Sequence, residues 1–304
     1  ETYLRDGNPT LDLYDEKFWE VFYEGIYLYH YWINYFINNN VLALSLSHDS
    51  YNATGIIADV AYKLKVPVYY INPRTFHKTL NRDDLYGRRF LNFNKYFNKL
   101  SLLQQNYAIK WSKKQIQKRF SGKIGVDMFY SEKSAFSKVR LERQFAKNKK
   151  LKVVIATHCF YDNPHGLGKM MFKDYYYWLN YLVNLSKKTN YDWYVKPHPD
   201  YLPGTLENIK KIVLDKSDIK LVEPSVSWKQ LVEEGLYVVL TCHGSLGHEL
   251  PLLGVKVINA AYNPHSGFTF NHHCKSLEEY EEAILNLKSL KIDFNKKDIY
   301  KFYY

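Results

Sequence analysis

The chain has 304 residues, 46% of them hydrophobic and 24% charged, which is the balance of a folded chain of about two domains rather than of a disordered one. Three cysteines without a Cys-x-x-Cys pair exclude a disulfide scaffold, argue against structural zinc and favour a reducing cytoplasm. No apolar run of about 18 residues is present, so we expect no membrane-spanning helix. The net charge is +11, and residues 74–150 alone hold 20 Lys and Arg against 5 Asp and Glu, a local +15 that indicates anionic partners.

The first half of the chain predicts a long helix followed by a βαβ unit. Apolar side chains lie on nearly every face of the helix expected from Phe18 to Ile37, so we expect it to pack between neighbouring elements. An apolar run at 41–47 predicts a buried strand, residues 54–64 a helix, and residues 66–71 a second strand.

Residues 74–150 form a different region, because they are basic, poor in strand signals and helical in pattern, most clearly at 109–120. We expect a basic helical insertion there. The polar, charged stretch 144–150 is the expected linker between two domains.

From residue 151 onward strands and helices alternate. The expected strands are 151–156, 193–195, 219–222, 237–240 and 255–258, and the expected helices are 174–187, 206–214, 227–234, 248–253 and 277–290. Asp174 and Ser227 are expected N-caps. This alternation predicts an α/β protein with two Rossmann-like domains, 1–150 and 151–304, whose parallel sheets face a central cleft.

The strongest local motif runs from Thr241 to Glu249, directly after a predicted strand and into a predicted helix. Glycines there let the backbone approach a ligand, a serine offers a hydroxyl and an N–H, and free amides at a helix start bind phosphate. A carboxylate one turn further on can accept hydrogen bonds from ribose. The candidate nucleotide-binding residues are His243, Gly244, Ser245, Gly247 and Glu249; the alternative is a glycine-rich turn capped by serine.

A second motif, KPHPD at residues 196–200, stands at the carboxyl end of a predicted strand, where doubly wound sheets bind ligands. Prolines on both sides of His198 restrict the loop. A histidine fixed in this way can donate to a phosphate oxygen, and Lys196 adds positive charge. Lys196, His198 and Pro199 therefore join the candidate nucleotide site; the alternative is a proline-stiffened turn with a surface histidine.

Two histidine-containing loops raise the question of a metal. His158, Asp162 and His165 lie in the polar loop 157–168, but His-x6-His with one Asp is weak zinc spacing, so we expect ligand contact or an ordinary loop. His265, His272, His273 and Cys274 lie in a loop for which we expect a place near the nucleotide base, or no role. We expect neither a metal nor a cofactor.

The first half offers the candidates for acid–base chemistry. His48 and Asp49 end the first predicted strand, and either of them can act as a general base toward an acceptor hydroxyl; Asp49 can equally be the N-cap of the next helix. Arg74 and His77 follow the next strand and are expected on the same rim, as contacts to an anionic acceptor or as surface residues.

The strand followed by KPHPD, and further on the strand followed by HGSLGHELPLLGVKVI, resemble the C-terminal domain of GT-B glycosyltransferases of bacterial capsule and lipopolysaccharide synthesis. Capsular polysaccharide transferases, including the Kdo transferases, and bacterial sialyl- and polysialyltransferases share an HP motif and a serine motif that hold the phosphate and cytidine of a CMP-sugar. His198 and Pro199 match the first motif, and Gly244 and Ser245 match the second. Glu249 falls where many GT-B enzymes place a ribose-binding carboxylate.

The resemblance covers residues 151–260, and this sequence departs from it in three ways. The serine motif reads His-Gly-Ser-Leu-Gly instead of Ser-Ser, no acidic motif in the first half matches the family's base, and no first Rossmann strand precedes Val41. We therefore expect the N-terminal domain to be incomplete and the chain to be part of a longer protein.

The resemblance implies a metal-independent glycosyltransferase that moves a sugar from a nucleotide donor, a CMP-sugar such as CMP-Kdo, to a cell-surface polysaccharide or lipid-linked glycan. The second domain would hold the nucleotide, and Asp49 or His48 would take the proton of the acceptor hydroxyl. The basic region suits an anionic glycan acceptor or the anionic lipids of the inner leaflet. We expect a cytoplasmic protein in peripheral contact with the inner face of the plasma membrane.

Three alternatives stay open. Teichoic-acid polymerases that use CDP-glycerol have a similar HP-type loop and serine motif, which would make the reaction a phosphotransfer. A sugar-nucleotide epimerase of the same architecture would convert its substrate without any acceptor. A basic nucleic-acid binder is the third alternative, but the chain has no known nucleic-acid motif and its charge lies away from the Gly-Ser loop, so we expect no nucleic acid partner.

Overall fold

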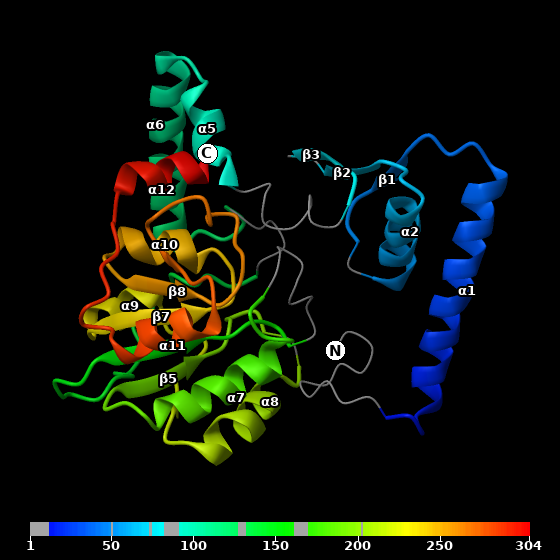
Figure 1. Cartoon of the computed structure of the whole chain (residues 1–304). Helices are drawn as coiled ribbons and strands as arrows, with labels where there is room; N and C mark the ends of the chain where they lie inside the picture. Colours follow the sequence, from blue (N-terminus) through cyan, green and yellow to red (C-terminus); the bar gives the residue numbers. More distant parts are fainter. Residues whose placement is uncertain are drawn as a thin grey trace. The chain divides into compact units, whose positions relative to one another are not determined.

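The computed structural model describes residues 12–49, 51–72, 75–81, 91–126, 132–160, 170–201 and 203–304. It divides into two compact units (Figure 1): unit 1 holds the described residues up to 81, and unit 2 holds those from 91 onward. This boundary differs from the expected position at residue 150. The reason is hydrophobic burial, because Phe136 and Phe145 are buried in the core of the unit 2 sheet.

Unit 1 contains the expected βαβ arrangement and one strand that was not expected. Its elements are α1 (Glu16–Asn38), β1 (Leu44–Leu46), α2 (Asn52–Lys63), β2 (Val68–Asn72) and β3 (Thr75–Thr79). Strands β1 and β2 are parallel, but β3 returns antiparallel to β2. Strand β3 thus adds an antiparallel strand to the expected parallel pair, and residues 75–79 form a strand within the region that was expected to be helical.

Helix α1 is as long as predicted, but most of it is not packed between neighbours. It lies against α2, and Phe36 is its buried residue, with Trp32 and Ile33 packed beside it. Most of its other aromatic residues, such as Tyr23 and Tyr27, are exposed within unit 1.

Unit 2 is built on a parallel sheet of six strands, in the order β6-β5-β4-β7-β8-β9. The strands are β4 (Lys152–Ala156), β5 (Asp192–Lys196), β6 (Lys220–Leu221), β7 (Leu236–Thr241), β8 (Lys256–Asn259) and β9 (His272–His273). The α/β fold with a parallel sheet is thereby confirmed for this unit. The edge strand β9 replaces part of the loop expected at 265–274.

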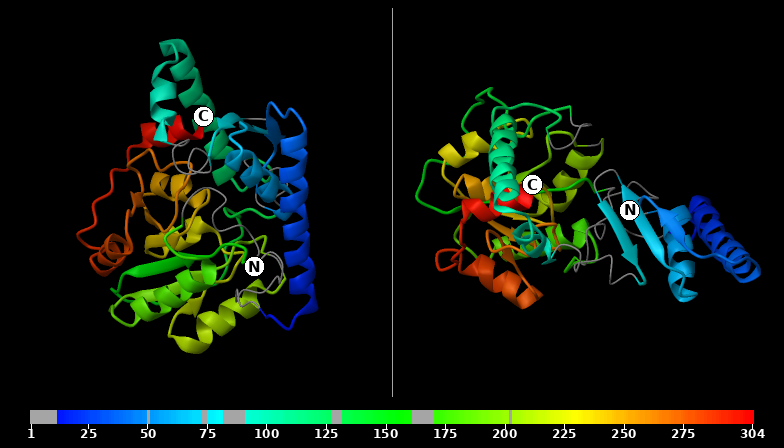
Figure 2. Two further views of the ribbon diagram at one scale, coloured as in Figure 1. Left: turned by 45° about the vertical axis from the view of Figure 1, so that its right-hand side comes forward. Right: turned by 90° about the horizontal axis from the view of Figure 1, so that it is seen from above.

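Helices cover both faces of the unit 2 sheet (Figure 2). The helices of unit 2 are α5 (Phe93–Asn98), α6 (Leu102–Phe120), α7 (Tyr175–Ser186), α8 (Thr205–Ile212), the 3-10 turn η1 (Leu214–Lys216), α9 (Trp228–Glu233), α10 (Leu246–Leu252), α11 (Leu277–Leu285) and α12 (Lys296–Tyr303). Of these, α5, α6 and α12 pack against one another, and α12 also packs against α10. Side chains alternate along a strand, so Val153 and Ile155 of β4 pack under α7, α8 and α11, while Val154 packs toward α9 and α10. The sheet therefore lies between two apolar layers.

Local hydrogen bonds explain where the helices begin and how the segment before β4 is held. The predicted N-caps are confirmed, since Asp174 accepts from the Tyr177 N–H at 2.9 Å and Ser227 from that of Lys229 at 3.3 Å. The expected linker at 144–150 is instead part of unit 2, because the Phe145 N–H donates to Glu234 Oε2 at 2.9 Å.

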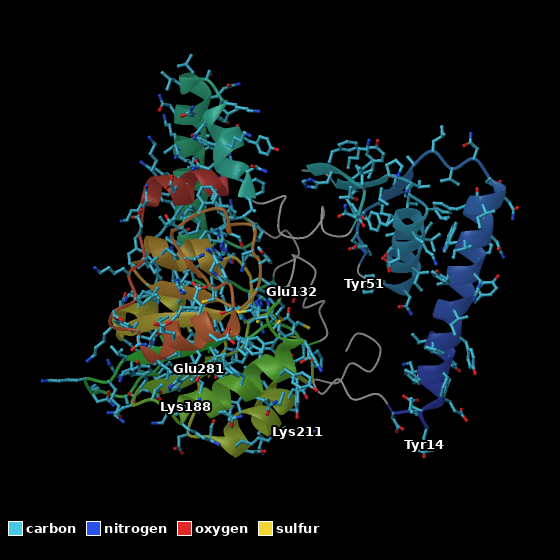
Figure 3. All side chains as sticks on the ribbon, viewed as in Figure 1. Tyr14, Tyr51, Glu132, Lys188, Lys211 and Glu281 are labelled. Atoms are coloured by element: carbon cyan, nitrogen blue, oxygen red, sulfur yellow. The ribbon has the colours of Figure 1, made fainter. Side chains whose placement is uncertain are left out.

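Two further findings complete the fold. Lys188, after α7, forms a 2.8 Å ion pair with Glu281 of α11 on the surface of unit 2, and both residues are labelled in Figure 3. None of the helices within the described ranges combines the length and apolar character needed to cross a membrane.

Candidate functional site

The candidate site lies at the carboxyl edge of the unit 2 sheet. Because the strands are parallel, the loops after β4, β5, β7 and β8 all leave from this edge, and they carry His158, His198, Ser245 and His265 in that order. Strands β5 and β7 flank β4. The KPHPD loop (the HP loop, residues 196–200) and residues 241–245 (the serine loop) therefore follow strands on either side of one central strand.

The serine loop turns sharply at Gly244 and is braced from the next loop. Gly244 has φ +124°, a left-handed conformation that favours glycine. Its N–H donates to Asn263 Oδ1 at 3.2 Å, and the Asn263 amide group donates to the carbonyl of Cys242 at 3.0 Å. Asn263 was not expected from the sequence, but its two bonds fix the conformation that presents Ser245.

Fewer backbone amides are available at the start of α10 than the motif predicted. The N–H groups of Gly247, His248 and Glu249 donate to carbonyls of the preceding turn at 3.0–3.2 Å. Within the described part of the chain, the N–H groups of Ser245 and Leu246 make no hydrogen bond. Ser245 is half-buried rather than enclosed, and its hydroxyl proton is donated to Glu249, so these two amides are the donors left for an anion.

A buried ion pair lies beneath Ser245. Arg119, at the end of α6, donates from Nε to Glu249 Oε1 at 2.5 Å, and Ser245 Oγ donates to Glu249 Oε2 at 3.0 Å. Both carboxylate oxygens of Glu249 are thus engaged, and only 1% of this residue is exposed. The structure therefore places Glu249 as a residue that positions Ser245, and not where the expected ribose contact needs it.

His198 is held so that one ring nitrogen faces outward as a donor. Its Nδ1 accepts the N–H of Asp200 at 3.1 Å, so the proton of the neutral ring sits on Nε2. Desolvation in the loop, together with the positive charges of Lys196 and Arg119, lowers the pKa of His198, although Asp200 opposes the shift. The positive charge of Arg119, which donates to Glu249, therefore also acts on His198 in the HP loop.

Lys196 occupies a different position from the expected one. It is 1% exposed, its ammonium donates to the carbonyl of Pro224 at 2.6 Å, and it lies 5.3 Å from the ring centre of Trp228. Burial lowers the pKa of Lys196 to about 7, against the opposing charge of Glu223. Lys196 therefore anchors the strand β5 and its loop from inside the protein.

Two residues outside the serine loop, His158 after β4 and Tyr175 of α7, hold the loop through its residue His243. The Nε2–H of the His158 ring donates a hydrogen bond to the carbonyl of His243, because a carbonyl oxygen can only accept. The His243 Nε2 is 2.8 Å from the hydroxyl of Tyr175, which stacks on His158 with ring centres 5.5 Å apart. His158 and His243 thus hold the backbone that leads into Gly244.

Gly247 and His265 pack against each other without room for a side chain. A Cβ at Gly247 would overlap the imidazole of His265 and would come within 3.0 Å of Asn271 Nδ2. His265 is 1% exposed and is hydrogen-bonded through Nδ1 to the Asn271 side chain at 3.0 Å. Gly247 therefore acts through close packing of α10 rather than by approach to a ligand.

In the histidine cluster at 265–273, His265 is buried and His272 and His273 are partly buried. Among the described residues no group of three His, Cys, Asp or Glu is placed to hold a metal ion. Burial, together with the positive charge of His272, lowers the pKa of His273 to about 4, and burial also lowers the pKa of His265 well below its usual value.

We expect this cluster to make unit 2 sensitive to acid. The folded pKa of His273 lies below its unfolded value of 6.5, so the unfolded chain binds the proton more readily, and the free energy of unfolding falls as pH drops from about 6.5 to about 4. The contribution of His273 is about 3 kcal/mol at most. Urea unfolding from pH 7 to 4 should show a shallower fall for His273→Gln. The exposed control variant His30→Gln should follow the wild-type slope, and equal slopes for both variants would contradict this role.

The predicted residues of unit 1 are placed individually. His48 is exposed, with Nδ1 3.5 Å from Thr54 Oγ1, and Asp49 is half-buried; α2 begins after Tyr51, so Asp49 is not its N-cap. His77 lies within β3, paired with Tyr70, and not on the rim after β2. Arg74 lies outside the described residues, and so do two candidates from the loop 157–168, Asp162 and His165.

No protein-family model matches the sequence, and no curated protein sequence matches it. Among solved structures the chain is similar to the beta Kdo 2,4 transferase KpsC of Thermosulfurimonas dismutans, with 14% identity, a TM-score of 0.43, and coverage of 83% of this chain and 76% of that one. It is also similar to the UDP-GlcNAc 2-epimerase of Neisseria meningitidis bound to UDP-GlcNAc, with 13% identity, a TM-score of 0.38, and coverage of 97% and 77%. For the UDP-GlcNAc 2-epimerase of Methanocaldococcus jannaschii the values are 13%, 0.35, 90% and 78%. These solved structures have the GT-B fold, which is the fold class that the sequence motifs predict.

Proposed function

We propose that the chain is a sugar-nucleotide-using enzyme in which unit 2 holds the phosphate of the donor. The observation that carries the proposal is the meeting of two motifs at one sheet edge. The HP loop and the serine loop follow strands on either side of β4, and the serine loop is held by the hydrogen bonds from Ser245 to Glu249 and from Arg119 to Glu249. An anion there would be bound by the N–H groups of Ser245 and Leu246 and by the Nε2–H of His198.

The same donors suit a leaving phosphate. Negative charge grows on the phosphate as the sugar departs, and fixed donors around it stabilise that charge without needing to reorganise. His198 supplies such a donor in its neutral form, because the bond from Asp200 keeps the proton on Nε2. Asn263 and His158 hold the serine loop and so keep its donors in place.

Within this class we propose a metal-independent, GT-B glycosyltransferase with a CMP-sugar such as CMP-Kdo as donor and an anionic cell-surface or lipid-linked glycan as acceptor. The support is the match of His198, Pro199, Gly244 and Ser245 to the HP and serine motifs. In unit 1, His48 and Asp49 follow β1, and we propose one of them as the base for the acceptor hydroxyl. Peripheral contact with anionic lipids at the cytoplasmic face belongs to the same proposal.

Nucleotide titrations test the site. We expect His198→Ala to weaken CMP binding about tenfold, because it removes one hydrogen bond to a charged phosphate. We expect Ser245→Ala to weaken CMP binding as well, because the bond from Ser245 to Glu249 that holds the serine loop and its amides in place is lost. Isothermal titration with CMP, CDP and UDP measures both the loss and the preferred base, and tighter binding of UDP would favour the epimerase.

The matched controls are Ser289→Ala and His30→Ala, which change the same residue types at exposed positions. Ser289 lies in the turn after α11, and His30 lies in α1. Both should bind CMP as the wild type does. If both site variants bind CMP as tightly as the wild type, the assignment of Ser245 and His198 to the nucleotide site is wrong.

A further inference from the structure

A cavity of about 530 Å³ opens beside the HP loop within unit 2. Its walls come from residues 121–124 directly after α6, from 133–138, and from Pro199 and Ser225. The volume is that of a small-molecule site rather than of a single bound ion. The cavity adjoins the proposed phosphate site, because Pro199 follows His198 and Ser121 stands two residues after Arg119.

The charged residues that line this cavity are all basic. They are Lys123, Lys133 and Lys138, and no acidic residue is in the lining. In the described part of the chain none of these lysines forms an ion pair. Acidic side chains adjoin the lining, but they are engaged: Asp200 accepts the N–H of Lys133, and Glu223 accepts from the hydroxyl of Ser225.

Serine hydroxyls complement the lysines. Ser134 Oγ accepts the N–H of Phe136 at 3.1 Å, and Ser137 Oγ accepts that of Val139 at 3.1 Å. Each of these hydroxyls therefore keeps its own proton to donate. Ammonium and hydroxyl donors together match a sugar that carries a carboxylate or phosphate, since a neutral sugar would leave the ammonium groups unpaired.

The cavity walls are fixed by contacts that do not involve a ligand. Asp200 Oδ2 accepts the N–H groups of Glu132, labelled in Figure 3, and of Lys133, at 3.2 and 3.3 Å. Phe136 is buried, and Gly122 takes φ +86°, where an added Cβ would lie 3.1 Å from the carbonyl oxygen of Phe136. The segment 132–138 is thus tied to the HP loop, so the basic wall and His198 are held as one structure.

We propose that this cavity, with Lys123, Lys133 and Lys138, binds the acidic sugar of the glycan acceptor beside the donor phosphate. This substrate class rests on the proposed function, because it assigns the acceptor of the same reaction. Three positive charges in one concave surface attract an anion more strongly than the same charges spread over the protein, and salt weakens the attraction.

The test compares two triple variants of equal net charge. The first is Lys123→Gln, Lys133→Gln and Lys138→Gln; the control is Lys211→Gln, Lys275→Gln and Lys288→Gln, which changes exposed lysines elsewhere on unit 2. The probes are a galacturonic acid trisaccharide, its neutral methyl ester and inorganic phosphate, titrated calorimetrically at low and at high salt. We expect the first variant to bind the trisaccharide at least about tenfold more weakly than the wild type and the control to bind it normally.

The remaining outcomes decide between carboxylate, phosphate and bulk charge. Weaker binding of the methyl ester than of the acid supports the proposal, and competition by inorganic phosphate shows that the cavity takes either oxyanion. Equal losses of trisaccharide binding in both variants, or no loss in the first, would overturn the proposal. It would also be overturned if a single-stranded oligonucleotide bound the wild type more tightly than the trisaccharide does and no longer bound the first variant. CMP titration of the same samples keeps the two proposals apart, since a wild type that binds the trisaccharide but no nucleotide contradicts the proposed function alone.

Discussion

Arg119→Met is expected to lower the free energy of unfolding of unit 2 by about 3–5 kcal/mol. The substitution removes the only cation paired with Glu249 among the described residues, while the Glu249 side chain stays 1% exposed. Water cannot reach that carboxylate to replace the lost 2.5 Å bond, so the desolvation cost of the charge remains without compensation. Urea unfolding followed by tryptophan fluorescence measures the loss.

The chain contains its own control for this experiment. Arg140 and Glu233 form an ion pair at 2.6 Å whose side chains are 66% and 59% exposed. Arg140→Met should therefore cost about 0–1 kcal/mol, because an exposed pair is screened by water and salt. If Arg119→Met costs no more than Arg140→Met, the buried pair does not hold the serine loop.

A double variant separates a lost ion pair from lost packing. In Arg119→Met with Glu249→Leu both charges are gone, and apolar groups of similar volume fill the space, so we expect most of the stability to return. Recovery would show that the isolated carboxylate caused the loss. CMP affinity should not recover to the same extent, because Ser245 then lacks the carboxylate that orients its hydroxyl.

The central strands β4 and β7 of unit 2 were predictable because they are buried on both faces and therefore read as continuous apolar runs, at 151–156 and 237–240. Strand β3 carries no such run: among its residues, Thr75 to Thr79, only Phe76 is apolar, and the strand lies in a basic region. The prediction that helix α1 packs between neighbours was wrong for the opposite reason. Aromatic side chains on nearly every face favour a buried helix, but most of those in α1 are exposed.

The site was predictable to the extent that its residues directly follow strands. Ser245 and His198 stand at positions that a parallel sheet brings to one edge, and the motifs around them follow strands that the sequence pattern predicts. The partner of Glu249 was not predictable, since Arg119 is separated from it by 130 residues and belongs to a helix with many other cations. Without that partner Glu249 looked like a free carboxylate.

Gly247→Ala is expected to lower the free energy of unfolding by about 1–3 kcal/mol, although alanine favours a helix over glycine by about 1 kcal/mol. The added Cβ would overlap the His265 ring, which is 1% exposed and enclosed by the rings of Phe270 and Phe302. The control is Gly25→Ala in α1, where the new Cβ would lie 3.6 Å from Ile56 Cδ1, an ordinary contact. That variant should gain the helix preference and lose nothing.

The double variant Gly247→Ala with His265→Ala then tests whether the imidazole is the cause. Removing the ring leaves space for the Cβ, so the double variant should be more stable than the sum of the two single effects predicts. A purely additive result would mean that the helix tolerates Cβ by moving away from His265. In that case Gly247 would be free to serve as a backbone contact to the nucleotide, as the sequence first suggested, and CMP affinity in Gly247→Ala would fall without a loss of stability.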